Sequence, residues 1–441
     1  MFRAIRQRFR WLILFCVVVI LIGLALFQFA IMPERRLFAL DAASGKVAWS
    51  IPIELNWSSY EEPVIDNGHV IITTNDANSD ARTEHWQVSA YDAGNGRSLW
   101  TYAPFGQAGI EQLCPSTINA SPIVANGRVY VYVCAATKPS DTMTSDKTSL
   151  VALDESTGTV VWEHDEPTLQ NTLTEGAPLT LRVLNGGVII LVRDKSGHWG
   201  VDVLDEKTGK SARRIDLPDL SVDDPPSLPV SDFESDGQTL YVNLNGLRAL
   251  DPLSGEVRYT LQVRDVAWTA QNGMYATSYV GPTVQIAAYD AKTGAVRWLR
   301  TLDKTLAPNA PDDALDVTIQ MRADAQTVYA FMIHHQSNLL WLVALNSGDG
   351  STRWIKPVQI DPIVADVLAK VAISPDLVAY NEVGEVTGIR VLAASDGSAR
   401  WFFPAYTKDS SPSTDGQRIY LFDESPRYRN WLVALNPAWH G

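Results

Sequence analysis

Few residues of this chain have the types and spacing of a reactive or metal-binding site. Asp232, Glu234 and Asp236 alternate like the first ligands of a calcium loop, yet no Glu stands at position twelve. His334 and His335 are adjacent, and neighbouring residues of a strand face opposite sides, so both imidazoles do not reach one metal. Nucleophile-elbow, phosphate-loop and zinc-protease motifs are missing. The sequence therefore predicts no catalytic residue and no metal site.

The residue types that do recur at fixed spacing are Asp, Gly and Trp. Nine times a short apolar strand ends in an acidic, amide or substitute residue, and in eight of the nine a Gly follows four residues later. In six of these eight, a Trp follows the Gly by four residues. Those six copies are Asp41/Gly45/Trp49, Asp92/Gly96/Trp100, Asp154/Gly158/Trp162, Asp290/Gly294/Trp298, Asn346/Gly350/Trp354 and Ala393/Gly397/Trp401.

The other copies depart from this pattern. Arg213 and Tyr259 stand where the fourth and fifth copies would carry Trp, and the ninth copy, at Asn436, has His440 in place of the Gly and ends before the Trp position. A turn pair falls in each of the eight intervals, and six of these pairs are Asn-Gly or Asp-Gly, which tolerate the positive φ of tight hairpins. Each interval thus contains four antiparallel strands, and eight such units predict an all-β, eight-bladed β-propeller over residues 37–441.

The two ends of the predicted propeller complement each other. The last unit has three recognisable strands, of which the third lies at 431–436, and the N-terminal part has a spare strand at 46–51. Pairing the two ends would close the ring and remove both open edges. We therefore expect the last blade to be completed by strand 46–51.

An apolar segment precedes the propeller. Residues 11–32 are 22 residues without a charge, long enough to cross a hydrocarbon core of about 30 Å. Four Arg lie before this segment and two follow it, a bias that places residues 1–10 in the cytoplasm. A signal peptide cleaved after Ala25 is the alternative. We expect an uncleaved transmembrane helix, a linker at 33–36, and a propeller on the periplasmic or extracellular side of the cell membrane.

Charge and cysteine content limit the partners and the compartment. Residues 1–36 hold six Arg and one Glu, which leaves a net charge of −19 on the rest of the chain. So acidic a body argues against a nucleic-acid partner. In an oxidising compartment Cys114 and Cys134 could form a disulfide, with two unrelated buried thiols as the alternative.

The repeat, Ala-Leu-Asp-x-x-Ser/Thr-Gly-x-x-x-Trp in its best copies, resembles the tryptophan-docking repeat of the pyrroloquinoline-quinone-like β-propellers. The resemblance covers residues 37–441 and implies that each repeat Trp packs between blades. Arg213 and Tyr259 leave the contacts of the fourth and fifth blades open. The family contains quinone-dependent dehydrogenases as well as cofactor-free scaffolds such as the outer-membrane-protein assembly lipoprotein.

The resemblance leaves more than one function open. Family dehydrogenases hold pyrroloquinoline quinone with calcium and usually use adjacent cysteines, whereas no two cysteines are adjacent here. We expect a membrane-anchored module without a cofactor that binds a protein or peptide at the membrane surface, in envelope assembly. The alternatives are a quinone-dependent dehydrogenase of alcohols or sugars and an extracytoplasmic sensor of a small molecule.

Overall fold

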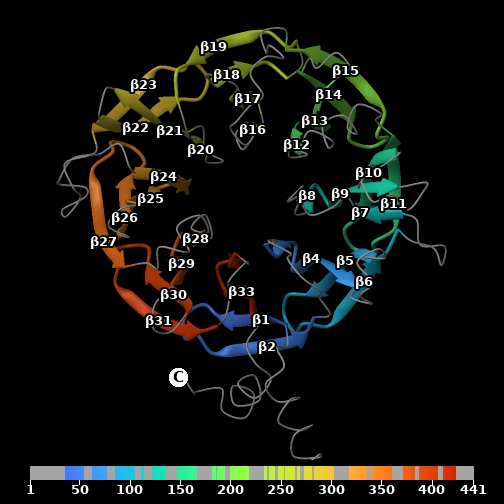
Figure 1. Ribbon diagram of the computed structural model, residues 1–441, viewed down its shortest axis with the longest axis horizontal. Helices are drawn as coiled ribbons and strands as arrows, with labels where there is room; N and C mark the ends of the chain where they lie inside the picture. The colour runs from blue at the N-terminus through green and yellow to red at the C-terminus, as the bar shows by residue number, and fades with distance from the viewer. Residues whose placement is uncertain are drawn as a thin grey trace, which may run out of the picture.

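Antiparallel strands arranged in a ring make up the described part of the molecule (Figure 1). The computed structural model describes residues 35–53, 62–76, 85–104, 111–113, 122–135, 147–165, 181–184, 186–193, 199–217, 233–235, 238–243, 247–252, 254–263, 266–268, 273–280, 283–301, 317–334, 339–359, 371–382, 387–405 and 411–423. Within these ranges the strands form eight sheets. The prediction of an all-β propeller with eight blades is confirmed.

Seven blades are each formed by consecutive strands, listed from the ring axis outward. Blade 1 is β3 (Val64–Asp66), β4 (His69–Asp76), β5 (His85–Asp92) and β6 (Ser98–Tyr102). Blade 2 is β7 (Glu111–Leu113) and β8 (Ile123–Ala125), then β9 (Arg128–Ala135), β10 (Lys147–Asp154) and β11 (Val160–Asp165). Blade 3 is β12 (Leu181–Leu184), β13 (Gly187–Arg193), β14 (Trp199–Asp205) and β15 (Ser211–Asp216). Blade 4 is β16 (Phe233–Ser235), β17 (Leu240–Asn243), β18 (Leu247–Leu250) and β19 (Val257–Leu261).

The next three blades follow the same plan. Blade 5 is β20 (Val266–Trp268), β21 (Gly273–Val280), β22 (Thr283–Asp290) and β23 (Val296–Thr301). Blade 6 is β24 (Val317–Ala323), β25 (Thr327–His334), β26 (Leu339–Asn346) and β27 (Thr352–Gln359). Blade 7 is β28 (Val371–Ser374), β29 (Leu377–Glu382), β30 (Gly388–Ala393) and β31 (Ala399–Pro404). Among the described strands, only those of blade 2 include a split innermost strand, since β7 and β8 both pair with β9.

Blade 8 joins the two ends of the chain. Its strands are β32 (Ser413–Thr414), β33 (Arg418–Asp423), β1 (Arg36–Asp41) and, outermost, β2 (Val47–Pro52). The sequence predicts one N-terminal strand, 46–51, in this blade and places 431–436 at its third position. The structure instead has two N-terminal strands there, because β1 pairs with β33 along its whole length. Residues 431–436 lie outside the described part of the chain.

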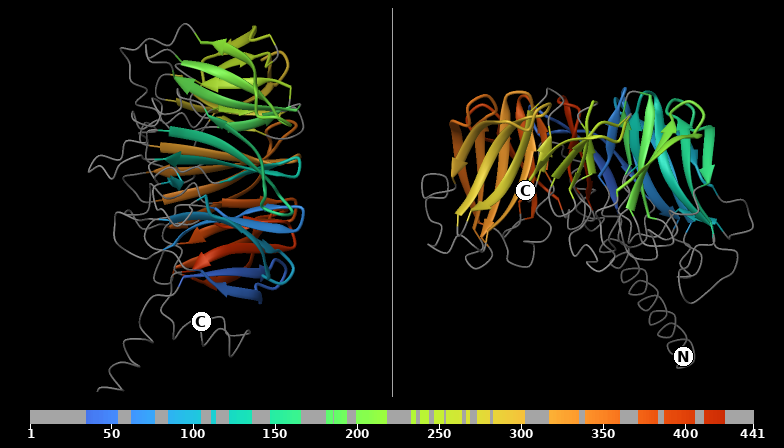
Figure 2. Two further views of the ribbon diagram at one scale, coloured as in Figure 1. Left: turned by 90° about the vertical axis from the view of Figure 1, so that its right-hand side faces the viewer. Right: turned by 90° about the horizontal axis from the view of Figure 1, so that it is seen from above.

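The two ends of the ring differ. The turn face carries the hairpin turns between first and second strands and the turns from the repeat Asp to the repeat Gly. The loop face carries the connections between second and third strands and those between blades; in the edge-on views of Figure 2 the strands run from one face to the other. Because β1 starts at Arg36, opposite Asp423 at the end of β33, the chain enters the propeller at the loop face.

The predicted membrane segment, 11–32, falls outside the described residues. Among those that the structure describes, no helix is long and apolar enough to span a membrane.

The apolar core is divided among the junctions between blades. Buried side chains form eight clusters, and each draws on two neighbouring sheets. The cluster between blades 1 and 2, for example, includes Ile71 and Trp100 from one blade and Val129 and Val151 from the next. Burial of this apolar surface is the main favourable free energy that holds the blades face to face.

A β-bulge lies at the same place in the outer strand of every blade. Ala90 is opposite Trp100 and Tyr91 is opposite Ser98, so Leu99 has no partner. The same skip occurs one residue before the Trp position in the other seven blades. Bulges twist an edge strand and hinder pairing with another chain. The bulged residue is therefore part of the fixed spacing from Gly to Trp.

Candidate functional site

The repeat Trp and the repeat Gly meet across the junction between blades. The ring of Trp100, in blade 1, lies on Gly158 in the turn of blade 2, where φ is +68° and an added Cβ would be 2.5 Å from Trp100 Cε3. Trp100 Nε1 also donates to the backbone oxygen of Glu155, at 2.7 Å. A side chain at this Gly would need both an unfavourable backbone conformation and the space that the indole fills.

This contact recurs around the ring. In each case the indole covers the Gly of the following blade and its Nε1 donates to the carbonyl of the residue after the repeat acid or its substitute. The pairs are Trp49 with Gly96, Trp162 with Gly209, Trp298 with Gly350, Trp354 with Gly397, and Trp401 with Gly45. Since Trp401 belongs to blade 7 and Gly45 to blade 8, the same contact also closes the ring.

The two divergent copies behave differently. Tyr259 takes over the whole role of a Trp, since its ring covers Gly294 and its hydroxyl donates to Ala291 O at 2.6 Å. Arg213 does not fill the junction. Its guanidinium donates to Ser254 O at 2.9 Å, and Ile215, two residues later, covers Gly255.

The repeat acids cap their own turns. Asp41 Oδ1 accepts hydrogen bonds from the backbone N and the hydroxyl of Ser44, at 2.8 and 2.6 Å, and these bonds lower the pKa of the Asp41 carboxyl. Asp154 and Asp290 bond in the same way to hydroxyl residues of their turns. Asn346 does so without a charge, through its Oδ1 and the backbone N of Gly348. These acids therefore shape the turn face.

Sequence reasoning missed a set of tyrosines on the second strands. Each ring packs at a tilt against the Trp of its own blade, with centroids 5.8–6.0 Å apart. The four residues are Tyr130, Tyr275, Tyr329 and Tyr420. Their signal in the sequence was their position two to four residues after the turn pair, in strands interpreted only as β-branched and aromatic.

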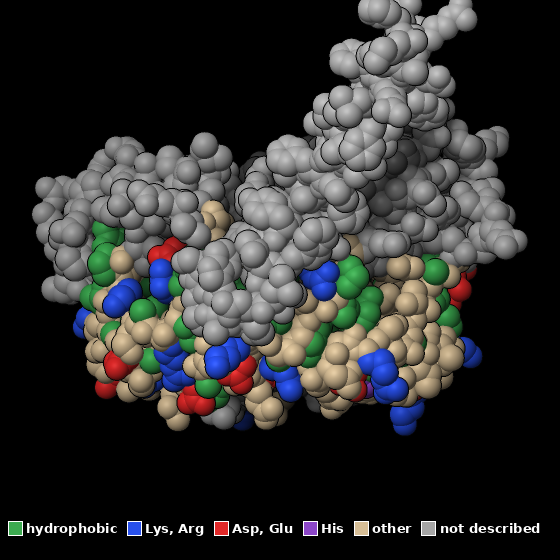
Figure 3. All heavy atoms as spheres, turned by 90° about the horizontal axis from the view of Figure 1, so that it is seen from below, with side chains coloured by type: hydrophobic (Ala, Val, Ile, Leu, Met, Phe, Trp, Pro, Cys, Tyr) green, Lys and Arg blue, Asp and Glu red, His purple; other side chains and the backbone are tan. Residues whose placement is uncertain are grey.

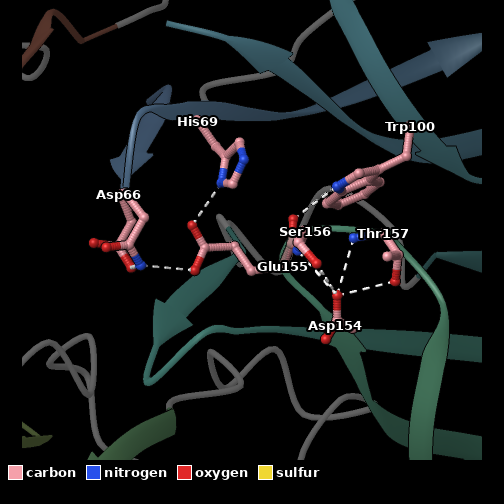
Figure 4. Close-up of polar contacts among 8 residues, drawn as sticks. Asp66, His69, Trp100, Asp154, Glu155, Ser156 and Thr157 are labelled. Atoms are coloured by element: carbon pink, nitrogen blue, oxygen red, sulfur yellow. Dashed lines mark hydrogen bonds and ion pairs between the residues drawn. The ribbon is translucent and has the colours of Figure 1, made fainter.

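A group of titratable side chains lies on the turn face, between blades 1 and 2 (Figure 4). Glu155, from the turn after β10, is 3% exposed. Its Oε1 lies 2.9 Å from His69 Nδ1 and its Oε2 accepts from Asn67 Nδ2 at 3.1 Å. Burial and the nearby Glu155 raise the pKa of Asp66. Both oxygens of the buried carboxylate thus have a partner in the preceding blade.

A second buried glutamate follows at the next junction. Glu206, between blades 2 and 3, is 9% exposed. Its Oε1 accepts from Asn126 Nδ2 at 2.9 Å and from the hydroxyl of Tyr130 at 3.3 Å. Burial, and next the charge of Glu206, raise the pKa of Tyr130 well above its usual range. The repeat pattern that we read stopped one residue before these two glutamates.

The polar side chains at these junctions hold neighbouring blades together. A carboxylate that orients an imidazole, as Glu155 orients His69, is also found in acid–base sites. Among the described residues, however, no three His, Cys, Asp or Glu side chains come close enough to hold a metal ion. The face in Figure 3 carries basic, acidic and hydrophobic side chains together over the described blades. The backbone of Cys134 pairs with Gln112; Cys114 lies outside the described residues, so the disulfide stays a prediction.

One family model matches this chain in three overlapping segments, residues 28–109, 81–212 and 143–271, and its description is outer membrane protein assembly factor BamB. Together these segments cover more than half of the chain. The dehydrogenase subunit of a quinone alcohol dehydrogenase from Gluconacetobacter polyoxogenes is 28% identical over 178 residues, which are 37% of this chain and 20% of that protein. The corresponding subunit from Komagataeibacter europaeus gives the same figures. This chain therefore matches only one fifth of the length of these relatives.

Two solved structures are similar to this chain at a low level. BamB from Moraxella catarrhalis has a TM-score of 0.43 and 13% identity, covering 88% of this chain and 91% of its own. A europium-containing methanol dehydrogenase has a TM-score of 0.46 and 11% identity, covering 82% and 81%. Similarity at this level carries no argument about function.

Proposed function

Because this chain belongs to the family of repeat propellers described as outer membrane protein assembly factor BamB, we propose that it is a scaffold that binds a protein partner at a membrane surface. The family suggests envelope assembly as the setting. The observation that carries the proposal is that the repeat residues have structural roles: Asp, Gly and Trp form the turns and the contacts between blades. A ring held in this way is a rigid platform for the connections at its ends.

The loop face is the proposed binding face. Its connections differ in length from blade to blade, whereas the turns of the opposite face repeat nearly the same residues. Because these connections differ, a partner could bind the loop face in a single orientation. With residues 11–32 as a membrane anchor, the entry of β1 at the loop face would hold that face toward the membrane.

The quinone-dependent dehydrogenase is the second candidate, favoured by the similarity to the alcohol dehydrogenase subunits. When bound in such an enzyme, the quinone accepts the electrons from the alcohol. The residues that the structure describes do not present the group of acidic ligands that calcium beside a quinone requires, and the chain has no adjacent cysteines.

A photo-crosslinking experiment in native membranes tests the scaffold. A crosslinker in place of Asp216, at the loop-face end of β15 and with a side chain 88% exposed, should capture a defined protein partner. The same group in place of the exposed Lys207, on the turn face of the same blade, should not. Equal capture at both positions, or at neither, would contradict the proposal.

The rival enzyme is tested on the purified full-length chain. Pyrroloquinoline quinone and calcium are added, and quinone binding and dye reduction with alcohols and sugars are measured. We expect no turnover above a sample without protein. Stoichiometric binding with sustained dye reduction would establish the dehydrogenase instead.

A further inference from the structure

One position of the repeat differs in residue type between the blades. The residue after the repeat acid or its substitute is Ala in four blades, at 42, 93, 291 and 394, and Glu in two, at 155 and 206. Both glutamates are buried. A buried carboxylate is costly unless it is fully hydrogen-bonded, so the two glutamates require an explanation that the alanines do not.

Both glutamates face a hairpin turn of the preceding blade that begins with Asn. Asn67 and Asn126 are the non-glycine residues with positive φ in the described part of the chain, at 43° and 53°. Asn67 Nδ2 donates to Glu155 Oε2 and to Asp66 Oδ2, both at 3.1 Å. Asn126 Nδ2 donates to Glu206. The same contact thus occurs twice, at successive junctions.

The contact requires an amide. A carboxamide nitrogen carries two N–H donors, and at Asn67 these two donors meet two carboxylates. An Asp at this position would offer only acceptors and would add a third negative charge beside Asp66 and Glu155. The second oxygen of Glu155 is engaged with His69.

In hairpin turns that begin with Asp, the side chain has different hydrogen-bond partners. Asp324 and Asp415 accept hydrogen bonds from backbone N–H groups of their own turns, at 2.7 and 2.6 Å. The position corresponding to Glu155 in the next blade is then Ala394 or Ala93, respectively. In this chain, Glu accompanies two of the four Asn-Gly turns, Pro252 and Ser347 accompany the other two, and Ala accompanies these Asp turns.

Asn-Gly is also the dipeptide most prone to deamidation, because Gly has no side chain to hinder attack at the neighbouring carboxamide. The backbone nitrogen of Gly68 attacks Cγ of Asn67, ammonia leaves, and water opens the resulting succinimide to Asp or isoaspartate. Both residues are exposed, and no atom lies within 4 Å of the place where Gly68 would carry a Cβ. Water and the reacting groups therefore have access.

We propose that Asn67 is a modification site whose deamidation loosens the junction between blades 1 and 2, with Glu155 as the group that distinguishes amide from acid. Asn126 and Glu206 form a second site of the same kind. We call each Asn–Glu pair a latch: it joins the two blades while the Asn is intact, and it is lost when deamidation converts the amide donor into a negatively charged carboxylate.

The test compares three variants of the full-length chain in urea unfolding. Asn67→Asp should lower the ratio of folded to unfolded molecules about tenfold or more, because a hydrogen bond to a buried charge is lost. Asn67→Asp combined with Glu155→Gln should recover part of that loss, because the new amide donates to the new acid. Asn346→Asp is the matched control, because it adds the same charge at a position where the Asn side chain acts as a hydrogen-bond acceptor. Four of the five other repeat copies that contain Trp carry Asp at this position.

The outcomes separate a specific latch from a general effect of charge. A native state unaffected by Asn67→Asp would overturn the proposal, as would a double variant no more stable than the single one or an equal loss with Asn346→Asp. If Asn67→Asp does not fold, a folded double variant supports the latch and an unfolded one refutes it. In the natural chain aged at mildly alkaline pH, mass spectrometry after pulse proteolysis should find molecules deamidated at Asn67 depleted from the surviving native fraction; an unchanged proportion would refute the proposal.

Discussion

Replacing a repeat Gly by Ala measures how much the junction depends on the indole contact. Gly158 and Gly68 both have positive φ, at +68° and +78°, so Ala costs about 1–2 kcal/mol of backbone strain at either site. At Gly158 the new Cβ would also be 2.5 Å from Trp100, and forcing extra volume into a packed site costs about 1–3 kcal/mol. At Gly68 nothing lies within 4 Å.

We therefore expect Gly158→Ala to lower the free energy of unfolding by about 2–5 kcal/mol and Gly68→Ala by about 1–2 kcal/mol. The assay is urea unfolding of the full-length chain, followed by tryptophan fluorescence and far-ultraviolet circular dichroism. In a Trp100→Ala background the extra cost of Gly158→Ala should disappear, because the space is then free. Equal effects of the two Gly substitutions, or an unchanged extra cost without the indole, would refute the inter-blade contact as the reason for the Gly.

Two further predictions concern the turn face and the membrane segment. Hydrogen bonds from the hydroxyls of Ser156 and Thr157 lower the pKa of Asp154 below its ordinary 3.8, so wild type should be more stable than Asp154→Ala above that pH. The advantage should fade as the pH falls through the folded-state pKa; unfolding of both proteins across acidic pH checks this, and a constant difference would contradict it. For the proposed anchor at 11–32, alkaline phosphatase fused after Gly441 should be active and the same enzyme fused after Arg10 inactive; the reverse pattern would disprove the topology.

The architecture was predictable because its signals are local. The repeat Gly residues reach positive φ in turns of fixed length, and the Asn-Gly pairs at 67–68 and 126–127 lie in tight hairpins with positive φ at both residues. Counting these marks yielded eight blades, and the structure has eight. The closing blade was harder, because the sequence shows an apolar strand at both 36–41 and 431–436, and only pairing with β33 selects the first.

The candidate site was less accessible to sequence reasoning. Glu155 and Glu206 look like two more charges on a turn, since nothing nearby in the sequence indicates burial. Their partners Asn67 and Asn126 are about 80 to 90 residues away in the chain. The sequence shows that Arg213 departs from the repeat. It does not show that Ile215 covers Gly255 instead, because this depends on which side chain contacts the next blade.

The sequence by itself therefore determined the strands, the turns, the repeat count and the role of Gly, because backbone conformation and strand period are set by residues close together in the chain. The tertiary structure decided how the ring closes, what fills the junction beside Gly255 and why two carboxylates are buried. These outcomes depend on side chains from different blades, whose distances are set only when the ring is complete.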